Sequence, residues 1–93
     1  MNNYPFSQEE ISENVVIRTF TNDIDDKELV WHRDREDRLV EAVGDTNWEV
    51  QLDNEIPQKI DKVFIPKNTY HRVIKGDGDL KVKVHFLKWL LLF

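Results

Sequence analysis

Cysteine is absent from the 93 residues of this chain. Without cysteine the chain can form no disulfide, no thiolate metal site and no cysteine nucleophile. The motifs that mark an activated serine nucleophile are absent as well. The sequence therefore excludes thiol chemistry and contains no established nucleophile motif.

Long apolar runs and an excess of positive charge are also missing. No segment approaches the ~20 apolar residues of a membrane span, and the first residues lack the apolar core of a signal peptide. The net charge of −5 argues against binding to nucleic acid. We therefore expect a cytoplasmic protein that has neither a membrane nor a nucleic acid as its partner.

The length fits one domain spanning residues 1–93. A domain of this size buries only about 60% of its unfolded surface, so its core is thin. Oligomerisation or a bound metal ion is a natural supplement to such a core. The apolar tail at residues 87–93 and the position of Trp31, on the strand face opposite His32, together predict a homodimer.

Apolar and polar side chains alternate with a period of two along much of the chain, which is typical of half-buried strands. Residues 1–13 are expected to form a loose arm or a short helix, because Ser7 and Glu10 have capping-box spacing. Turn signals separate the other segments, including a predicted hairpin at 44–47. The predicted strands cover residues 14–20, 28–34, 38–43, 48–53, 63–65, 71–74 and 80–86. This pattern predicts an all-β, antiparallel barrel or sandwich.

The chain is organised around a strand, a tight turn and a second strand at residues 63–74. Pro66 ends the first strand because it has no N–H to donate to a sheet. Asn68 is one of the few residues besides glycine that tolerate a left-handed backbone. The turn therefore fixes His71 at the start of the second strand.

Two histidines and one aspartate form a candidate metal site. His32 and Asp34 are two residues apart, so in a strand both side chains point to the same face. His71, on another strand, can complete a set of two imidazoles and one carboxylate. This set suits non-haem iron, zinc or manganese and leaves positions open for water or a substrate. The alternative is that Asp34 pairs with a nearby arginine and each histidine is an ordinary polar residue.

The spacing of these residues resembles two motifs of the cupins, small β-barrels that often hold one metal ion. Pro66, Asn68 and His71 match the second motif, Pro-x-Gly-x-x-His, with asparagine in place of glycine. His32 matches the first histidine of the His-x-His motif, and Asp34 replaces the second.

The resemblance covers residues 29–86 and implies a single small jelly-roll barrel that binds one divalent ion: Zn, Fe, Mn or Ni. Asp37 is the nearest match to the acidic ligand of the first motif, so it is the first candidate for a fourth metal ligand, with Glu36, Gln51 and water as the alternatives. Arginine recognises carboxylate and phosphate groups through two parallel hydrogen bonds. Four arginines lie close in sequence to the candidate ligands: Arg33, Arg35, Arg38 and Arg72. We therefore predict an anionic small-molecule ligand at the barrel mouth, although these arginines could instead pair with acids on the surface. The predicted substrate contacts are Arg38, Gln51, Tyr70 and Arg72.

The predicted function is that of a metal-dependent enzyme acting on a small polar or anionic substrate. Cupins include dioxygenases, isomerases, epimerases and lyases, so the resemblance does not select a reaction. The alternative is a non-catalytic module that binds a small ligand, or a structural dimer.

Overall fold

The computed structural model describes residues 4–87, within which the chain forms eight strands and one short 3-10 helix. The elements are β1 (Ser7–Ser12), β2 (Val15–Phe20), η1 (Asp26–Glu28), β3 (Asp37–Ala42), β4 (Glu49–Leu52), β5 (Gln58–Lys59), β6 (Lys62–Ile65), β7 (His71–Ile74) and β8 (Leu80–Leu87). Among these described residues, no helix is both long and apolar enough to cross a membrane.

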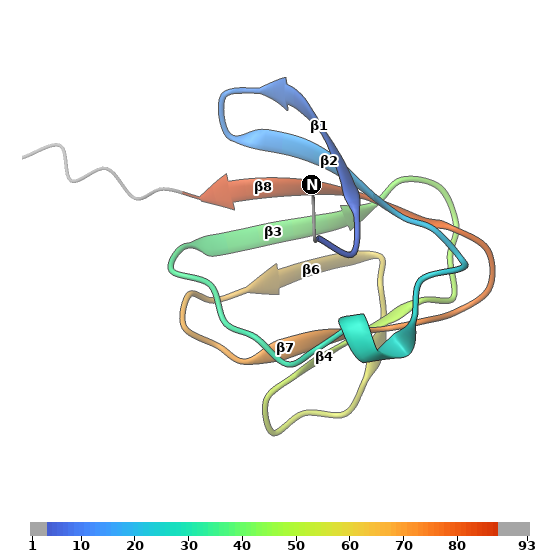
Figure 1. The fold of residues 1–93 in the computed structure, drawn as a ribbon. Coiled ribbons are helices and arrows are strands. Elements are labelled where there is room, and N and C mark those ends of the chain that lie inside the picture. Colours follow the sequence, from blue (N-terminus) through green and yellow to red (C-terminus); the bar gives the residue numbers. More distant parts are fainter. Residues whose placement is uncertain (1–3, 88–93) are drawn as a thin grey trace, which may run out of the picture.

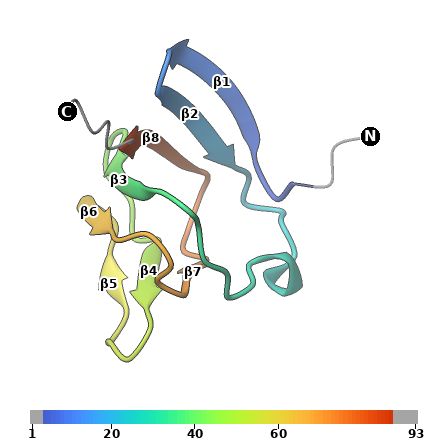
Figure 2. The same cartoon turned by 90° about the vertical axis from the view of Figure 1, so that its left-hand side faces the viewer.

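The strands form two antiparallel sheets. The larger sheet has the strand order β1-β2-β8-β3-β6, and the smaller sheet has the order β5-β4-β7. Figures 1 and 2 show the β1–β2 hairpin at one side of the molecule and the smaller sheet at the other. The prediction of an all-β, antiparallel fold is confirmed. Within residues 4–87 the two sheets remain separate and do not close into one continuous barrel.

The core lies between the two sheets and follows the two-residue period of the strands. On β8, Leu80, Val82 and Val84 are buried and occupy alternate positions, so they share one face. The strand register places Val84 opposite Val16 on one side and Val40 on the other. The buried apolar residues are Val16, Phe20, Ile24, Trp48, Val50, Leu52, Ile60, Val63, Ile65, Leu80, Val82 and Val84.

The connection between β7 and β8 packs against Trp48, whose side chain has no solvent exposure. The indole Nε1–H of Trp48 donates a hydrogen bond to the Gly78 carbonyl oxygen at 3.0 Å. Gly76, which lies in this connection, approaches the backbone of Asn47 and Trp48 closely. A Cβ atom at Gly76 would lie 2.7 Å from the Trp48 backbone nitrogen and would also collide with the Asn47 side chain. The sequence therefore needs glycine at this position for close backbone approach.

We expect Gly76→Ala to lower the free energy of unfolding by about 1–3 kcal/mol, the usual cost of forcing an extra methyl group into a packed site. Gly44→Asn is the matched control, because nothing lies within 4 Å of a Cβ at Gly44 and asparagine tolerates its positive φ. Urea unfolding followed by circular dichroism measures both variants. Equal midpoints for Gly76→Ala and the parent would contradict the expected clash.

The structure differs from the predicted local structure in three places. Residues 7–12 form strand β1, because Ser7 pairs with Thr19 and the polar segment extends the open edge of β2. The strand predicted at 28–34 is reduced to one isolated bridge at His32. The preceding segment forms the helix η1 instead, whose first turn is capped by Asp25, since the Asp25 carboxylate accepts from the Lys27 N–H. The turn at 44–47 is no hairpin, since β3 and β4 lie in different sheets.

The short strand β5 has no counterpart among the predicted strands, because its two exposed residues give no alternation to detect. The apolar tail predicted at 87–93 lies outside the described residues, apart from Leu87 at the end of β8. The homodimer stays a prediction.

Candidate metal centre

Two reciprocal backbone hydrogen bonds hold His32 and His71 opposite each other. The His32 N–H donates to the His71 carbonyl oxygen at 3.0 Å, and the His71 N–H donates to the His32 carbonyl oxygen at 2.8 Å. Directly opposed residues of an antiparallel pair project their side chains to the same side. The two imidazole rings accordingly lie 4.2 Å apart between centroids. His71 is 4% exposed, whereas His32 lies at the solvent-exposed rim.

The turn before His71 also positions Asp34. Asn68 adopts the left-handed backbone that the sequence predicts, with a φ of 62°. Its N–H donates to the Asp34 carbonyl oxygen at 2.7 Å, while the Lys67 N–H donates to Asp37 Oδ1 at 2.7 Å. The turn therefore brings Asp34 beside His71. Asp37, predicted as a fourth ligand, binds the turn and is not part of the group of ligand atoms that the structure brings together.

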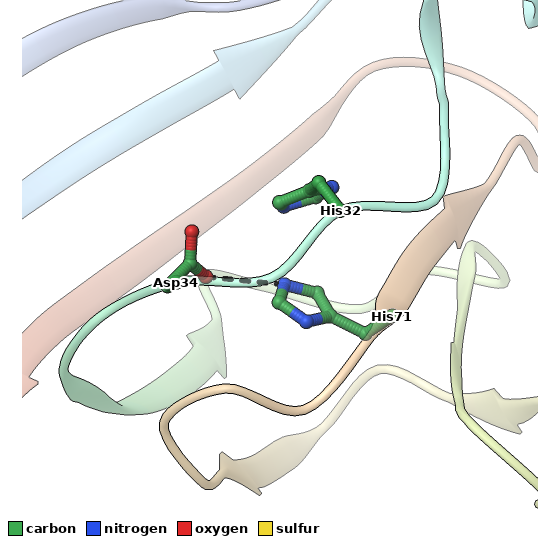
Figure 3. A group of neighbouring side chains, drawn as sticks. All are labelled: His32, Asp34 and His71. Carbon is green, nitrogen blue, oxygen red and sulfur yellow. Dashed lines mark ion pairs between the residues drawn. The ribbon is translucent and has the colours of Figure 1, made fainter.

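His32, Asp34 and His71 converge as the sequence predicts. One potential ligand atom from each residue lies within 4.8 Å of the other two. Figure 3 shows the Asp34 carboxylate and the His71 ring directed at one another, with the His32 ring close by. Sites that bind zinc or iron through imidazole and carboxylate use this set of donors.

The hydrogen bonds of the two rings determine which nitrogen carries the proton. His32 Nδ1 lies 3.0 Å from the Val30 carbonyl oxygen, and His71 Nδ1 lies 2.8 Å from the Thr69 carbonyl oxygen. A carbonyl oxygen only accepts, so Nδ1 is the protonated nitrogen in the neutral form of each ring. Each Nε2 then presents a lone pair. Histidine ligands in metal sites are commonly oriented through such a bond from the other ring nitrogen.

Asp34 has one carboxylate oxygen that lacks a donor. Oδ1 lies 3.3 Å from Arg38 Nη2, which fulfils part of the alternative prediction that Asp34 pairs with an arginine. Oδ2 lies 3.3 Å from His71 Nε2, yet it is buried and has no hydrogen-bond partner among the described residues. With His71 neutral, a lone pair faces an anionic oxygen. A cation between these two atoms would compensate both.

The pKa of the Asp34 carboxyl group lies below its ordinary value. Burial acts to raise this pKa, but a hydrogen bond donated by protonated His71 and the positive charge of Arg38 together lower it by more; a metal ion between the two residues would take the place of that proton. Asp34 is therefore an anion at neutral pH, as a metal ligand must be.

A cavity of about 650 Å³ opens beside these three residues, between the two sheets. Its walls are mostly valine, leucine, isoleucine and phenylalanine side chains. The polar groups in its lining include His32, Asp34, His71, Arg38 and Arg18. A small molecule in this cavity would therefore contact an apolar surface and an ionic one at the same time.

Of the four predicted substrate contacts, only Arg38 lines the cavity. Tyr70 and Arg72 flank the inward-facing His71 in sequence, so strand alternation directs both away from the cavity. Arg72 instead donates to Gln51 Oε1 at 3.0 Å and stacks on the Trp31 ring. The structure thus places Gln51, Tyr70 and Arg72 outside the cavity.

Arg18 lines the cavity but is absent from the residues predicted for the site. A signal for it exists in the sequence, because Arg18 has the same strand parity as the buried Val16 and Phe20. An arginine at a core-facing position of a strand is an exception that calls for a partner or a ligand.

Comparison with solved structures shows several similar folds at low sequence identity. A cupin domain from Bordetella pertussis matches with a TM-score of 0.62 and 15% identity, covering 95% of this chain and 99% of that one. A candidate mannose-6-phosphate isomerase from Ralstonia eutropha matches with a TM-score of 0.59 and 16% identity, over 89% and 83% of the two chains. A structure of DMSP lyases matches with a TM-score of 0.64 and 18% identity.

The match to the DMSP lyase structure covers 75% of this chain but only 35% of the lyase chain, so this chain spans about a third of that length. No protein-family model and no curated protein sequence matches this chain. The structural likeness confirms the fold to which the two histidine motifs pointed. The chain has a cupin fold.

Proposed function

We propose that this cupin-fold chain binds one divalent metal ion through His32, Asp34 and His71 and acts as a metal-dependent enzyme on a small molecule in the adjacent cavity. The observation that carries the proposal is the buried Asp34 Oδ2, which has no donor among the described residues and faces His71 Nε2 at 3.3 Å. With His71 neutral these are two acceptors that repel each other, and either a proton on Nε2 or a metal ion between the two atoms removes that repulsion.

The donor set fits such an ion. Two neutral imidazoles and one carboxylate suit zinc, iron, manganese or nickel. A bound ion would act as a Lewis acid toward an oxygen of the molecule in the cavity. The protein residues have separate tasks: the Val30 and Thr69 carbonyls orient the imidazoles, and Arg38 holds the second oxygen of Asp34. The apolar walls exclude water from the body of the bound molecule.

A non-catalytic binding module is the second candidate. It is favoured by the lining of the cavity, in which Glu28 is the one carboxylate apart from Asp34 among the described residues. Glu28 lies on the exposed helix η1, so the described lining holds no buried carboxylate besides the proposed metal ligand Asp34. Metal binding is common to both candidates, and catalysis distinguishes them.

We expect the full-length chain to bind one divalent ion per molecule. Elemental analysis of the purified protein, followed by calorimetric titration with Zn²⁺ and Mn²⁺ after chelator treatment, measures the stoichiometry. Affinity is expected to fall as the solution is made acidic, because imidazolium cannot ligate a metal. Absence of saturable binding at neutral pH by either ion would contradict the proposed function.

A further inference from the structure

On the inner face of the larger sheet, strands β2, β3, β6 and β8 present apolar side chains and two arginines, while Gln8 of the edge strand β1 lies beside Arg18. Arg18 on β2 and Arg38 on β3 both line the cavity among valine, isoleucine and phenylalanine side chains. Arg18 lies directly opposite Val82, which is 3% exposed. Placing a charged group on such a face costs free energy unless the charge is compensated.

The two arginines differ in how their charges are compensated. Arg38 forms ion pairs with Asp34 at 3.3 Å and with Glu36 at 2.8 Å. Arg18 uses only its Nε–H, which donates to Gln8 Oε1 at 2.8 Å. No hydrogen bond or ion pair from the described residues reaches the terminal nitrogens of Arg18, Nη1 and Nη2. Its charge is therefore not matched by a contacting carboxylate within residues 4–87.

Aromatic rings hold the Arg18 guanidinium group in place. Its Cζ atom lies 4.2 Å from the centroid of the Phe6 ring and 5.6 Å from that of Phe86. Burial, together with the nearby charge of Arg38, lowers the pKa of Arg18 to about 10. Arg18 is still a cation at neutral pH. The planar group is thus positioned before any ligand arrives, and its two terminal nitrogens are available.

We propose that Arg18 binds the carboxylate of a monoanionic ligand whose apolar body fills the cavity between Arg18 and the metal centre. The two terminal nitrogens of a guanidinium match the two oxygens of a carboxylate in parallel hydrogen bonds. A guanidinium without a contacting carboxylate favours an anionic ligand, and the apolar walls favour a ligand with a hydrocarbon body. This proposal rests on the proposed function, because it assigns the substrate class of the same cavity.

The test compares hexanoate with its uncharged analogue hexanamide by calorimetric titration of the full-length protein, with Zn²⁺ present and after chelator treatment. The parent is expected to bind hexanoate at least tenfold more tightly than hexanamide in both conditions. Arg18→Gln is expected to weaken hexanoate binding about tenfold to a hundredfold, the equivalent of losing a charge-assisted hydrogen-bond pair. Its affinity for hexanamide is expected to stay unchanged.

Arg33→Gln is the matched control, since Arg33 is exposed and stacks on Tyr70 outside the cavity. It is expected to bind hexanoate as the parent does. Arg18→Lys, which keeps the charge but loses the two parallel donors, is expected to bind with intermediate affinity. Circular dichroism establishes that each variant is folded, and the comparison of hexanoate with hexanamide on the parent needs no variant.

Equal binding of hexanoate by the parent and by folded Arg18→Gln would overturn this proposal. Failure of the parent to prefer hexanoate over hexanamide, or to bind hexanoate at millimolar concentration, would also overturn it. Failure of the proposed function gives a different result. The parent would then bind no divalent ion, while its Arg18-dependent preference for hexanoate over hexanamide would persist in chelator-treated protein.

Discussion

His71→Ala is expected to weaken divalent metal binding by more than a hundredfold. Replacing a residue that merely orients a metal ligand typically costs 10–100-fold in affinity, so removal of a ligand itself costs more. His71 is the innermost of the three residues, at 4% exposure, and its Nε2 faces Asp34 Oδ2. Calorimetric titration with Zn²⁺ measures the loss directly.

Two further variants isolate the effect of the ligand from an effect on folding. His32→Ala removes a ligand at the exposed rim, where the side chain contributes little to the core, and it is also expected to weaken binding strongly. His85→Ala is the matched control, because His85 pairs with Glu41 at 2.7 Å and lies outside the group of ligand atoms. Parent-like affinity in both His71→Ala and His32→Ala would end the metal hypothesis.

Trp48→Ala is expected to lower the free energy of unfolding by about 3–5 kcal/mol. Trp48 is completely buried, packs against Phe20 with ring centroids 6.1 Å apart, and donates to the Gly78 carbonyl oxygen. A truncation to alanine removes these contacts and leaves the carbonyl without that donor. Small domains are stable by only about 5–15 kcal/mol, so a loss of this size removes a large part of the stability and lowers the unfolding midpoint.

Thermal and urea unfolding followed by far-ultraviolet circular dichroism measures this loss without using tryptophan fluorescence. Trp31→Ala provides the control, since Trp31 is 42% exposed and lies outside the core. It is expected to change the free energy of unfolding by about 0.5 kcal/mol at most, as is usual for surface substitutions. Comparable losses in the two variants would contradict the assignment of Trp48 to the centre of the core.

The sequence predicts the strands that have an apolar face and fails where packing gives no local signal. Alternation identifies β8 and β4, because their core residues recur at every second position. Strand β1 has six exposed residues and forms through pairing with β2, so its own side chains do not reveal it. The sheet to which a strand belongs is decided by long-range pairing. The turn signal at 44–47 therefore predicts a hairpin, although β3 and β4 lie in different sheets.

The same distinction applies to the site. The spacing of His32, Asp34 and His71, together with its resemblance to the cupin motifs, identifies the three residues, although the backbone pairing of His32 with His71 that brings them together is visible only in the folded chain. Asp37 has a suitable residue type and spacing, but its carboxylate accepts from the Lys67 N–H, a contact that only the folded chain defines. Arg18 could have been found in the sequence by noting that a charged residue occupies a position of β2 between the buried Val16 and Phe20.

The reciprocal backbone pairing of His32 and His71 has a consequence for chain entropy. It closes a loop of roughly 40 residues, and a covalent cross-link over such a length contributes about 4 kcal/mol in the chain-entropy model. An ion ligated from both ends of that loop would act as a reversible cross-link in a chain that has no cysteine. Unlike a covalent link, it acts only in the native state, and its contribution grows with the concentration of free ion. The concentration of free divalent cation would then determine how stably the segment before β3 remains paired with β7.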